Sequence, residues 1–261
     1  MLLPALSSIS ARAEMHPLAQ HLASRFRCVI PDWPGFGDHP REAVALSPDA
    51  MRRFLYAFIH KNLRSPAVGI AAGHAATYLI QAASHHPSRF SHLVLIAPTW
   101  RGPLPTMLGE TRRGLCDAIR HTIEWPIIGE ALYRLNVSRP VVASMLRSHV
   151  YADARKVTPD VIAAKLSITR HPRARFATAA FVTGALDPVR SRDEFVRLFE
   201  ASLPPILMLR PRKGRPRSAA EMDALSAIGR VATVTIPGAL AAHEEEPEAL
   251  ARAIAEFVVA T

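Results

Sequence analysis

Short apolar runs rich in β-forming residues alternate with helical patterns along most of this chain. Because neighbouring parallel strands need a crossover between them, usually a helix, this alternation predicts a mostly parallel sheet covered by helices on both faces. The chain has 261 residues, 49% of them hydrophobic, which is enough to bury the core of one such α/β unit. The expected strands are Arg27–Pro31, Ala67–Ala72, His92–Ala97, Pro205–Leu209 and Val231–Ile236. The expected helices are Met15–Ser24, Pro48–Asn62, Ala75–His86, Ala219–Ile228 and Glu245–Val259.

The strand pattern stops between residues 98 and 203, where several short helical patterns are broken by Gly and Pro. We therefore expect 98–203 to be a helical lid inserted into a core formed by 1–97 and 204–261. Large side chains in this segment are irregularly spaced, so they either pack the lid or line an apolar ligand pocket. They are Trp100, Trp125, Tyr133, Met145 and Tyr151.

The whole chain has a net charge of +10, and its densest group of positive charges lies in residues 210–217. The segment is either an exposed basic loop or an anion site for a phosphate, a coenzyme A tail, an acidic lipid of a membrane surface or a partner protein. No aromatic residues interleave with these charges, so we expect no nucleic-acid partner. The basic residues are Arg210, Arg212, Lys213, Arg215 and Arg217.

Other composition signals favour a cytoplasmic protein without cofactors. No apolar run reaches the roughly 18 to 20 residues that span a bilayer, and the apolar N-terminus lacks the basic region of a signal peptide. The two cysteines, Cys28 and Cys116, fall in separate predicted elements and suggest no disulfide framework. The histidines lack metal-ligand spacing and no phosphate-binding Gly-rich loop is present, so we expect neither a metal nor a cofactor.

Three segments in order give the chain a resemblance to a known family. Pro31–Asp38 contains an Asp-x-x-Gly-x-Gly loop, Gly73-His74-Ala75 follows the next predicted strand, and His92–Pro98 forms a third. Together they resemble the α/β-hydrolase superfamily, most of all its lidded branch of esterases and haloalkane dehalogenases. The resemblance implies the α/β-hydrolase fold, a nucleophile–acid–base triad and an earlier strand pair that this sequence lacks before Met1.

The nucleophile of that triad has no counterpart here. In such enzymes it stands at a sharp turn from strand to helix, written G-x-S-x-G. Aligning the segment Gly73, His74, Ala75 and Ala76 with the common Gly-His-Ser places the nucleophile at Ala75, whereas the Gly69–Gly73 spacing places it at Ala71. We prefer Ala75, and neither alanine can attack a carbonyl group.

The oxyanion-hole position of the family is also changed. Pro4-Ala5 stands where the family has His-Gly, and proline has no amide hydrogen to donate, although Ala5 and Leu6 do.

The acid and the base are displaced as well. The acid loop is occupied by the basic segment, whose first following carboxylate is Glu221, while Asp187 lies in an acid-like loop that precedes the expected strand. The base position falls on Ala239 or Leu240, and His243 lies a few residues later.

We therefore expect a non-hydrolytic member of this fold that binds a small apolar or amphipathic molecule or a protein partner. The alternative is an enzyme of changed mechanism, hydrolase-like or lyase-like. In it His243 or His74 would carry a proton, Asp187 or Glu221 would orient the base, and backbone amides would hold an oxyanion.

Overall fold

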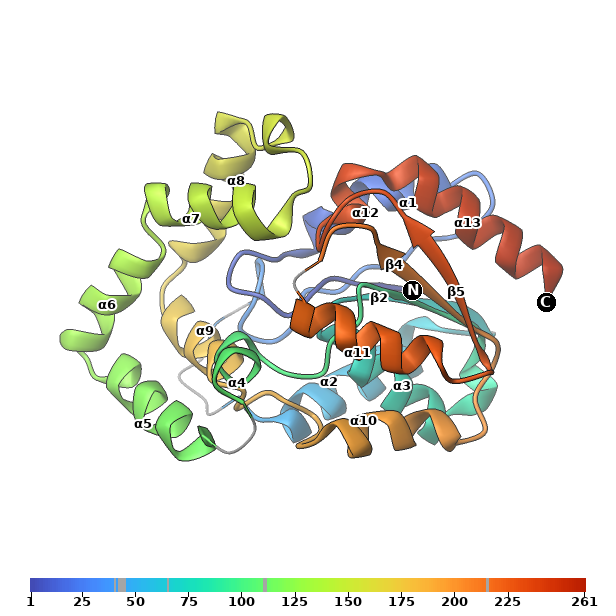
Figure 1. Ribbon diagram of the computed structural model, residues 1–261, viewed down its shortest axis with the longest axis horizontal. Coiled ribbons are helices and arrows are strands. Elements are labelled where there is room, and N and C mark those ends of the chain that lie inside the picture. The colour runs from blue at the N-terminus through green and yellow to red at the C-terminus, as the bar shows by residue number, and fades with distance from the viewer. Residues whose placement is uncertain (40, 42–45, 65, 110–111, 215) are drawn as a thin grey trace.

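A parallel five-stranded sheet runs through the middle of the protein, with the strand order β1-β2-β3-β4-β5 (Figure 1). The computed structural model describes residues 1–39, 41, 46–64, 66–109, 112–214 and 216–261. The strands are β1 (Leu2–Leu3), β2 (Ala67–Ala72), β3 (Phe90–Ile96), β4 (Ile206–Pro211) and β5 (Val231–Ile236). This sheet and its helices confirm the predicted α/β class.

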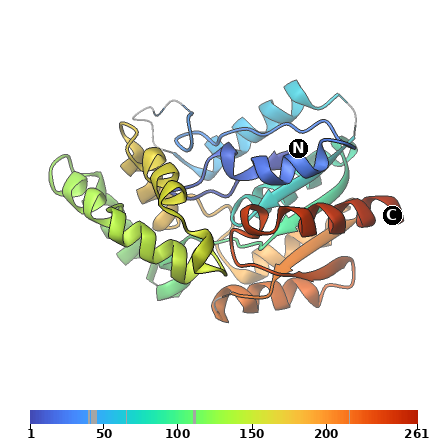
Figure 2. The same cartoon turned by 90° about the horizontal axis from the view of Figure 1, so that it is seen from above.

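Helices occupy both faces of the sheet and the long connection between β3 and β4 (Figures 1 and 2). The core helices are α1 (His16–Leu22), α2 (Pro48–Asn62), α3 (Ala75–His85), α11 (Pro216–Ser226), α12 (Ala242–Glu245) and α13 (Pro247–Ala260). The α-helices between β3 and β4 are α4 (Pro103–Leu108), α5 (Arg113–Glu124), α6 (Ile128–Asn136), α7 (Arg139–Met145), α8 (Pro159–Thr169), α9 (Ala174–Val182) and α10 (Arg192–Arg197). Shorter 3-10 turns are η1 (Arg12–Met15), η2 (Pro87–Arg89), η5 (Ala154–Lys156) and η6 (Leu198–Glu200), and η4 (Leu146–Val150) is a π-turn.

The strands β1 to β4 bury apolar side chains on both faces, as parallel strands covered by helices must, whereas β5 at the edge of the sheet buries only Val231 and Ile236. Leu93 and Leu95 of β3 point into one cluster, which α2, α3, α10 and α11 cover. Val94 and Ile96 of the same strand point into the other cluster, which α1 and α13 cover. Successive residues thus serve opposite layers, which is why these strands read as continuous apolar runs.

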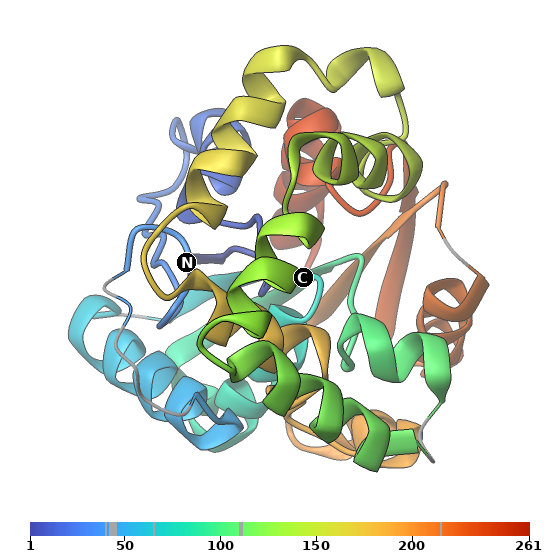
Figure 3. The same ribbon diagram turned by 90° about the vertical axis from the view of Figure 1, so that its left-hand side faces the viewer.

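The connection between β3 and β4 contains helices and turns but no strand in its described residues. Most of its helices lie beside the sheet instead of on a face of it (Figures 1 and 3). A third apolar cluster joins them to the core, because Leu146 and Leu166 pack there with Ile9 and Ala241. Toward the end of the connection, Phe195 returns to the main core. The expected boundaries of a lid at 98–203 remain a prediction.

Two predicted elements differ from the structure in kind or number, while the ends of the others differ by up to three residues. The expected strand Arg27–Pro31 is not a strand; Val29 accepts one backbone hydrogen bond from Leu2 at 2.9 Å, and Pro31 has no N–H to extend the pairing. The expected helix Glu245–Val259 is divided, because α12 ends at Glu245 and Pro247 begins α13. Proline is well suited to the first turn of a helix but not to its interior.

No helix in these described ranges combines the length and the apolar character needed to cross a bilayer.

Candidate functional site

The turn from β2 into α3 is made by Gly73. Its φ is +54°, whereas His74 already has the helical φ of −66°. A side chain at Gly73 would have room, since an added Cβ would meet only the Cβ of Ala5, at 3.5 Å. Ala71 lies inside β2 and Ala75 inside α3, and both are fully buried. Neither alanine considered from the sequence therefore stands at the sharp turn, where glycine adopts a positive φ without steric cost.

The loop after β1 packs beside this turn, but the N–H of Ala5, the first in that loop because Pro4 has none, already donates a hydrogen bond within the protein. The Ala5 amide donates to Glu14 Oε1 at 2.7 Å. The Leu6 side chain is buried. The Ala5 N–H is therefore directed at a carboxylate of the protein and cannot also hold a substrate oxyanion without breaking that bond.

The Asp-x-x-Gly-x-Gly loop supports the same region. Trp33 Nε1 donates to Pro4 O at 2.9 Å, and Asp32 Oδ1 accepts from the Arg12 amide at 2.6 Å. Gly37 has a φ of +52°, and a Cβ there would lie 2.0 Å from Asp32 Oδ1. The bonds of Asp32 and Trp33 fix the loop after β1 and η1 against the Asp-x-x-Gly-x-Gly loop.

His74 and Asp187 form a buried pair. His74 Nε2 lies 3.1 Å from Asp187 Oδ1, and the same oxygen accepts from the Gly102 amide at 2.8 Å. His74 Nδ1 and Asp187 Oδ2 are buried with no hydrogen-bond partner. The carboxylate thus joins the start of α3 to the connection between β3 and β4.

His243 lies in a second buried cluster, which we call the Glu14 cluster (Glu14, Lys165, His243 and Glu244). His243 Nε2 is 3.5 Å from Glu14 Oε1, and Lys165 Nζ lies 2.8 Å from Glu244 Oε1 and 3.8 Å from Glu14 Oε2. Three separate elements, η1, α8 and α12, supply these side chains. His243 therefore pairs with Glu14, not with Asp187 or Glu221 as a relocated triad would need.

Electrostatics in the Glu14 cluster favour charged side chains. Burial acts to raise the pKa of Glu14, but the adjacent His243 and the charge of Lys165 outweigh it and lower that pKa. Burial acts to lower the pKa of Lys165, but the charges of Glu244 and Glu14 outweigh it and raise that pKa. The result is a buried ion-pair network with an ammonium group at its centre.

Three ligand-type atoms in this cluster, from Glu14, His243 and Glu244, lie within 4.8 Å of one another. Lys165 Nζ already lies beside both carboxylates, so the positive charge that a metal ion would bring is supplied by the protein itself.

The other candidate acid, Glu221, is held by cations away from both histidines. It accepts from Arg101 Nη2 at 2.8 Å, from Arg192 Nη2 at 2.9 Å and from Trp100 Nε1 at 3.1 Å. These contacts join α11 to the connection between β3 and β4.

Much of the basic segment binds the protein's own backbone and side chains. Arg210 pairs with Asp223 at 2.7 Å, Lys213 Nζ donates to Ala152 O at 2.9 Å, and Arg217 donates to Thr106 O and Met107 O. Arg212 is exposed and, with Arg210, lines a cavity of about 240 Å³, while Arg215 lies outside the described residues. An anion site here remains a prediction, and the observed contacts tie the segment to the helical connection.

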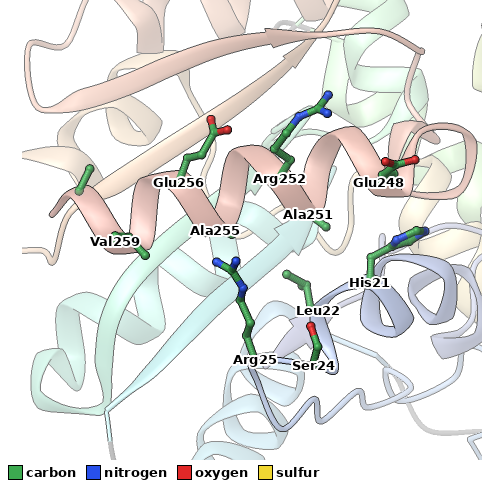
Figure 4. A pocket seen from close by; sticks show the side chains of 11 residues that line it. His21, Leu22, Ser24, Arg25, Glu248, Ala251, Arg252, Ala255, Glu256 and Val259 are labelled. Carbon is green, nitrogen blue, oxygen red and sulfur yellow. The ribbon is translucent and has the colours of Figure 1, made fainter.

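A larger cavity of about 660 Å³ lies between α1 and α13, on a face of the sheet (Figure 4). Its lining includes the charged side chains of Arg25, which follows α1, and of Arg252 and Glu256 on α13, together with apolar residues of both helices. None of its lining residues belongs to the Gly73 turn, the His74–Asp187 pair or the Glu14 cluster.

Sequence reasoning identified Gly73, His74, Asp187 and His243 but missed Glu14 and Lys165. The available signal was Lys165 itself, one of only four lysines and placed within an otherwise largely apolar helix pattern. A lysine on a buried helix face needs a counter-charge, so the sequence predicts a buried carboxylate beside Lys165 without showing which one it is.

Comparisons with known proteins agree with the architecture. The sequence matches the family model of the α/β hydrolases over residues 3–253. A serine hydrolase involved in carbazole degradation, the CarC enzyme, is 16% identical with a TM-score of 0.75, covering 100% of this chain and 90% of that one. A thermophilic esterase from Thermogutta terrifontis is 20% identical with a TM-score of 0.66, and the match covers 95% of this chain and 85% of the esterase. A haloalkane dehalogenase variant from Bradyrhizobium elkanii is 14% identical with a TM-score of 0.69 (99% and 88% covered).

No curated protein matches the chain in sequence. At such low identities, the likeness to the solved structures concerns the fold and not the reaction.

Proposed function

The chain belongs to the α/β-hydrolase family, and we propose that it acts by binding an apolar or amphipathic partner without hydrolysing esters through an acyl-enzyme. Family membership implies the fold and the region where a reaction would be expected, the turn between β2 and α3.

One observation supports the proposal: the hydrogen bonds and ion pairs described for the candidate nucleophile, base and acid positions do not link the three together. Gly73 makes the strand-to-helix turn and has no nucleophilic atom. The candidate base and acid are each paired elsewhere, His243 with Glu14 and Asp187 with His74. A triad requires the nucleophile, base and acid to be hydrogen-bonded in sequence, and these contacts describe two separate pairs.

The binding half of the proposal is supported by the surface of the helical connection. Trp125 is 59% exposed and Ile127 is 84% exposed, which is unusual for such large apolar side chains in a group. An apolar or amphipathic partner would remove this surface from water.

Ester hydrolysis by the purified protein tests the catalytic half. We would measure turnover of nitrophenyl esters of increasing chain length by the parent and by His243→Ala, with folding of both checked by thermal melting. We expect both to release nitrophenol at the same slow rate. Turnover by the parent that His243→Ala abolishes, with the fold intact, would overturn the proposal.

Thermal stabilisation by saturated fatty acids of increasing chain length tests the binding half. A ligand that binds only the folded state raises its stability by RT ln(1 + [L]/Kd), about 2.7 kcal/mol at one hundred times Kd. We expect a saturable rise in Tm with the longer chains. An unchanged Tm across the series would exclude a small amphipathic ligand and direct the search to a protein partner.

A second candidate function follows from the Glu14–His243 pair. His243 is 2% exposed, lies in the segment after β5 and is next to a carboxylate, as a general base and its orienting acid would be. In that case Glu14→Gln and His243→Ala would lower turnover together. Equal rates in the parent and both variants would exclude this candidate.

A further inference from the structure

Exposed apolar side chains concentrate on the connection between β3 and β4. Of eleven large apolar side chains that are exposed among the described residues, eight belong to this connection. Contiguous exposed apolar surface on a protein usually marks an interaction site. The eight are Met107, Leu115, Trp125, Ile127, Ile128, Leu132, Leu135 and Val141.

Five of them form what we call the α5–α6 apolar face (Trp125, Ile127, Ile128, Leu132 and Leu135). The last three are spaced by four and three residues along α6, so they share one side of that helix. Gly129 and Tyr133 on the same helix are buried. α6 therefore exposes apolar side chains beside its buried residues, in addition to the polar side that Glu130 and Arg134 form.

The α5–α6 turn lies at the end of the molecule farthest from the sheet (Figure 1). Figure 3 shows α5, α6 and α7 in front, with no other element covering them on that side. Trp125 and Ile127 stand at this turn, 59% and 84% exposed, where a large surface could contact them.

The segment that carries the α5–α6 apolar face has an excess of positive charge. Residues 112–150 contain six arginines, three acidic residues and no lysine. One of those acids, Glu130, is paired with Arg134 at 2.8 Å and with Arg175 at 3.0 Å. The exposed charged residues of this segment are Arg112, Asp117, Arg134, Arg139 and Arg147.

We propose that the α5–α6 apolar face docks the protein on the surface of a bilayer containing anionic lipids. Trp125 and Ile127 would enter the region between headgroups and acyl chains, while the exposed arginines of residues 112–150 would contact lipid phosphates. A symmetric contact with a second copy would instead bring arginine-rich rims together, which like-charge repulsion disfavours. This docking does not depend on whether the protein hydrolyses esters.

The helices are suited to lying on a membrane and not to spanning it. α5 has 12 residues and α6 has 9, which at 1.5 Å per residue gives lengths of roughly 18 and 14 Å, well short of a hydrocarbon core of about 30 Å. Contact is therefore confined to one bilayer surface.

Vesicle sedimentation tests the proposal with a matched pair of variants. Ile127→Asp places a charge at an 84% exposed position within the α5–α6 apolar face, and Val259→Asp does the same at an 80% exposed position on α13. We expect the full chain to sediment with vesicles of phosphatidylcholine and phosphatidylglycerol, and less so as salt is raised. Ile127→Asp should weaken this binding by about ten- to a hundredfold, the equivalent of losing one buried Ile side chain. Val259→Asp should leave it unchanged.

Tryptophan fluorescence gives an independent readout. Trp33 and Trp100 are buried, at 1% and 0% exposure, so a change of solvent environment on vesicle addition should report Trp125. We expect a blue shift in the parent that Trp125→Phe removes while sedimentation persists.

Three outcomes would overturn membrane docking. The protein does not sediment with these vesicles; both aspartate variants bind equally well; or sedimentation velocity shows a dimer that Ile127→Asp dissociates, with no vesicle binding by the parent. The last result would assign the face to a second copy of the chain.

Discussion

His74 Nε2 lies 3.1 Å from Asp187 Oδ1, and each side chain is only 1% exposed. The carboxylate also accepts the Gly102 amide. One buried oxygen therefore holds together the start of α3 and two points of the connection between β3 and β4. This gives Asp187 a structural role that does not require catalysis.

Replacing that carboxylate should destabilise the fold. In Asp187→Ala, the Gly102 amide and His74 lose their acceptor while remaining buried, and an unsatisfied buried group costs about 1–3 kcal/mol. We expect the free energy of unfolding to fall by about 2–3 kcal/mol in urea titrations. The exposed Asp193 provides the control, since Asp193→Ala should cost less than about 1 kcal/mol. Equal losses in the two variants would contradict the role assigned to Asp187.

Lys165 should contribute more to the free energy of unfolding than Lys156, a lysine that forms a more exposed ion pair. Lys165→Met leaves Glu14 and Glu244 without the cation they share, and removing one partner of a buried ion pair costs about 3–5 kcal/mol. Lys156 pairs with Glu246, and these side chains are 40% and 35% exposed, so Lys156→Met should cost about 1 kcal/mol or less. Urea unfolding at neutral pH measures both.

A rescue experiment separates charge from packing. Adding Glu14→Gln and Glu244→Gln to Lys165→Met removes the unpaired negative charges, so part of the lost stability should return. If the triple variant is no more stable than Lys165→Met, lost packing rather than unpaired charge explains the effect.

Architecture could be read from this sequence because it depends on local patterns. The alternation of strands and helices gave the bounds of β2, β5 and α2 correctly, since apolar runs, the Ser47 cap and proline at a first helical turn all act within a few residues. The pairing of Glu14 with Lys165 could not be read, because it joins residues 151 positions apart.

The sequence does not determine which residue makes the turn after β2. Aligning Gly73-His74-Ala75 with Gly-His-Ser places this glycine before the turn residue. In the structure Gly73 is itself the residue with positive φ. A sequence pattern does not report backbone torsion, and a glycine fits either position.

Lowering the pH should remove the contribution that the charged Glu221 makes to the free energy of unfolding. Burial acts to raise its pKa, but the hydrogen bonds of Arg192 and Trp100 and the charge of Arg101 outweigh it, so the pKa lies below its usual value of 4.5. Since the folded-state pKa is the lower one, this stability is present above pH 4.5 and is lost as the pH falls through the folded-state pKa.

Glu221→Gln should therefore unfold more easily than the parent at neutral pH, by about 1–3 kcal/mol, and the difference should shrink below pH 4.5. Glu256→Gln, on the exposed side of α13, is the control and should follow the parent at every pH. A constant difference for Glu221→Gln across the pH range would show that the charge of Glu221 does not contribute.

Restoring a hydroxyl at the turn should not restore a hydrolase. Gly73→Ser has space for its Cβ 3.5 Å from that of Ala5, and the positive φ of +54° should cost about 1–2 kcal/mol, so the variant should fold. Its hydroxyl would need a base, and the contacts described for His243 and Asp187 are with Glu14 and His74, not with the turn residue. We therefore expect fluorophosphonate, which labels activated serines, to react with Gly73→Ser no faster than with Ala75→Ser, whose hydroxyl would be buried in α3. Labelling that is rapid in Gly73→Ser and lost on adding His243→Ala would show that His243 can reach the turn, and would contradict the separation of base and nucleophile position that we propose.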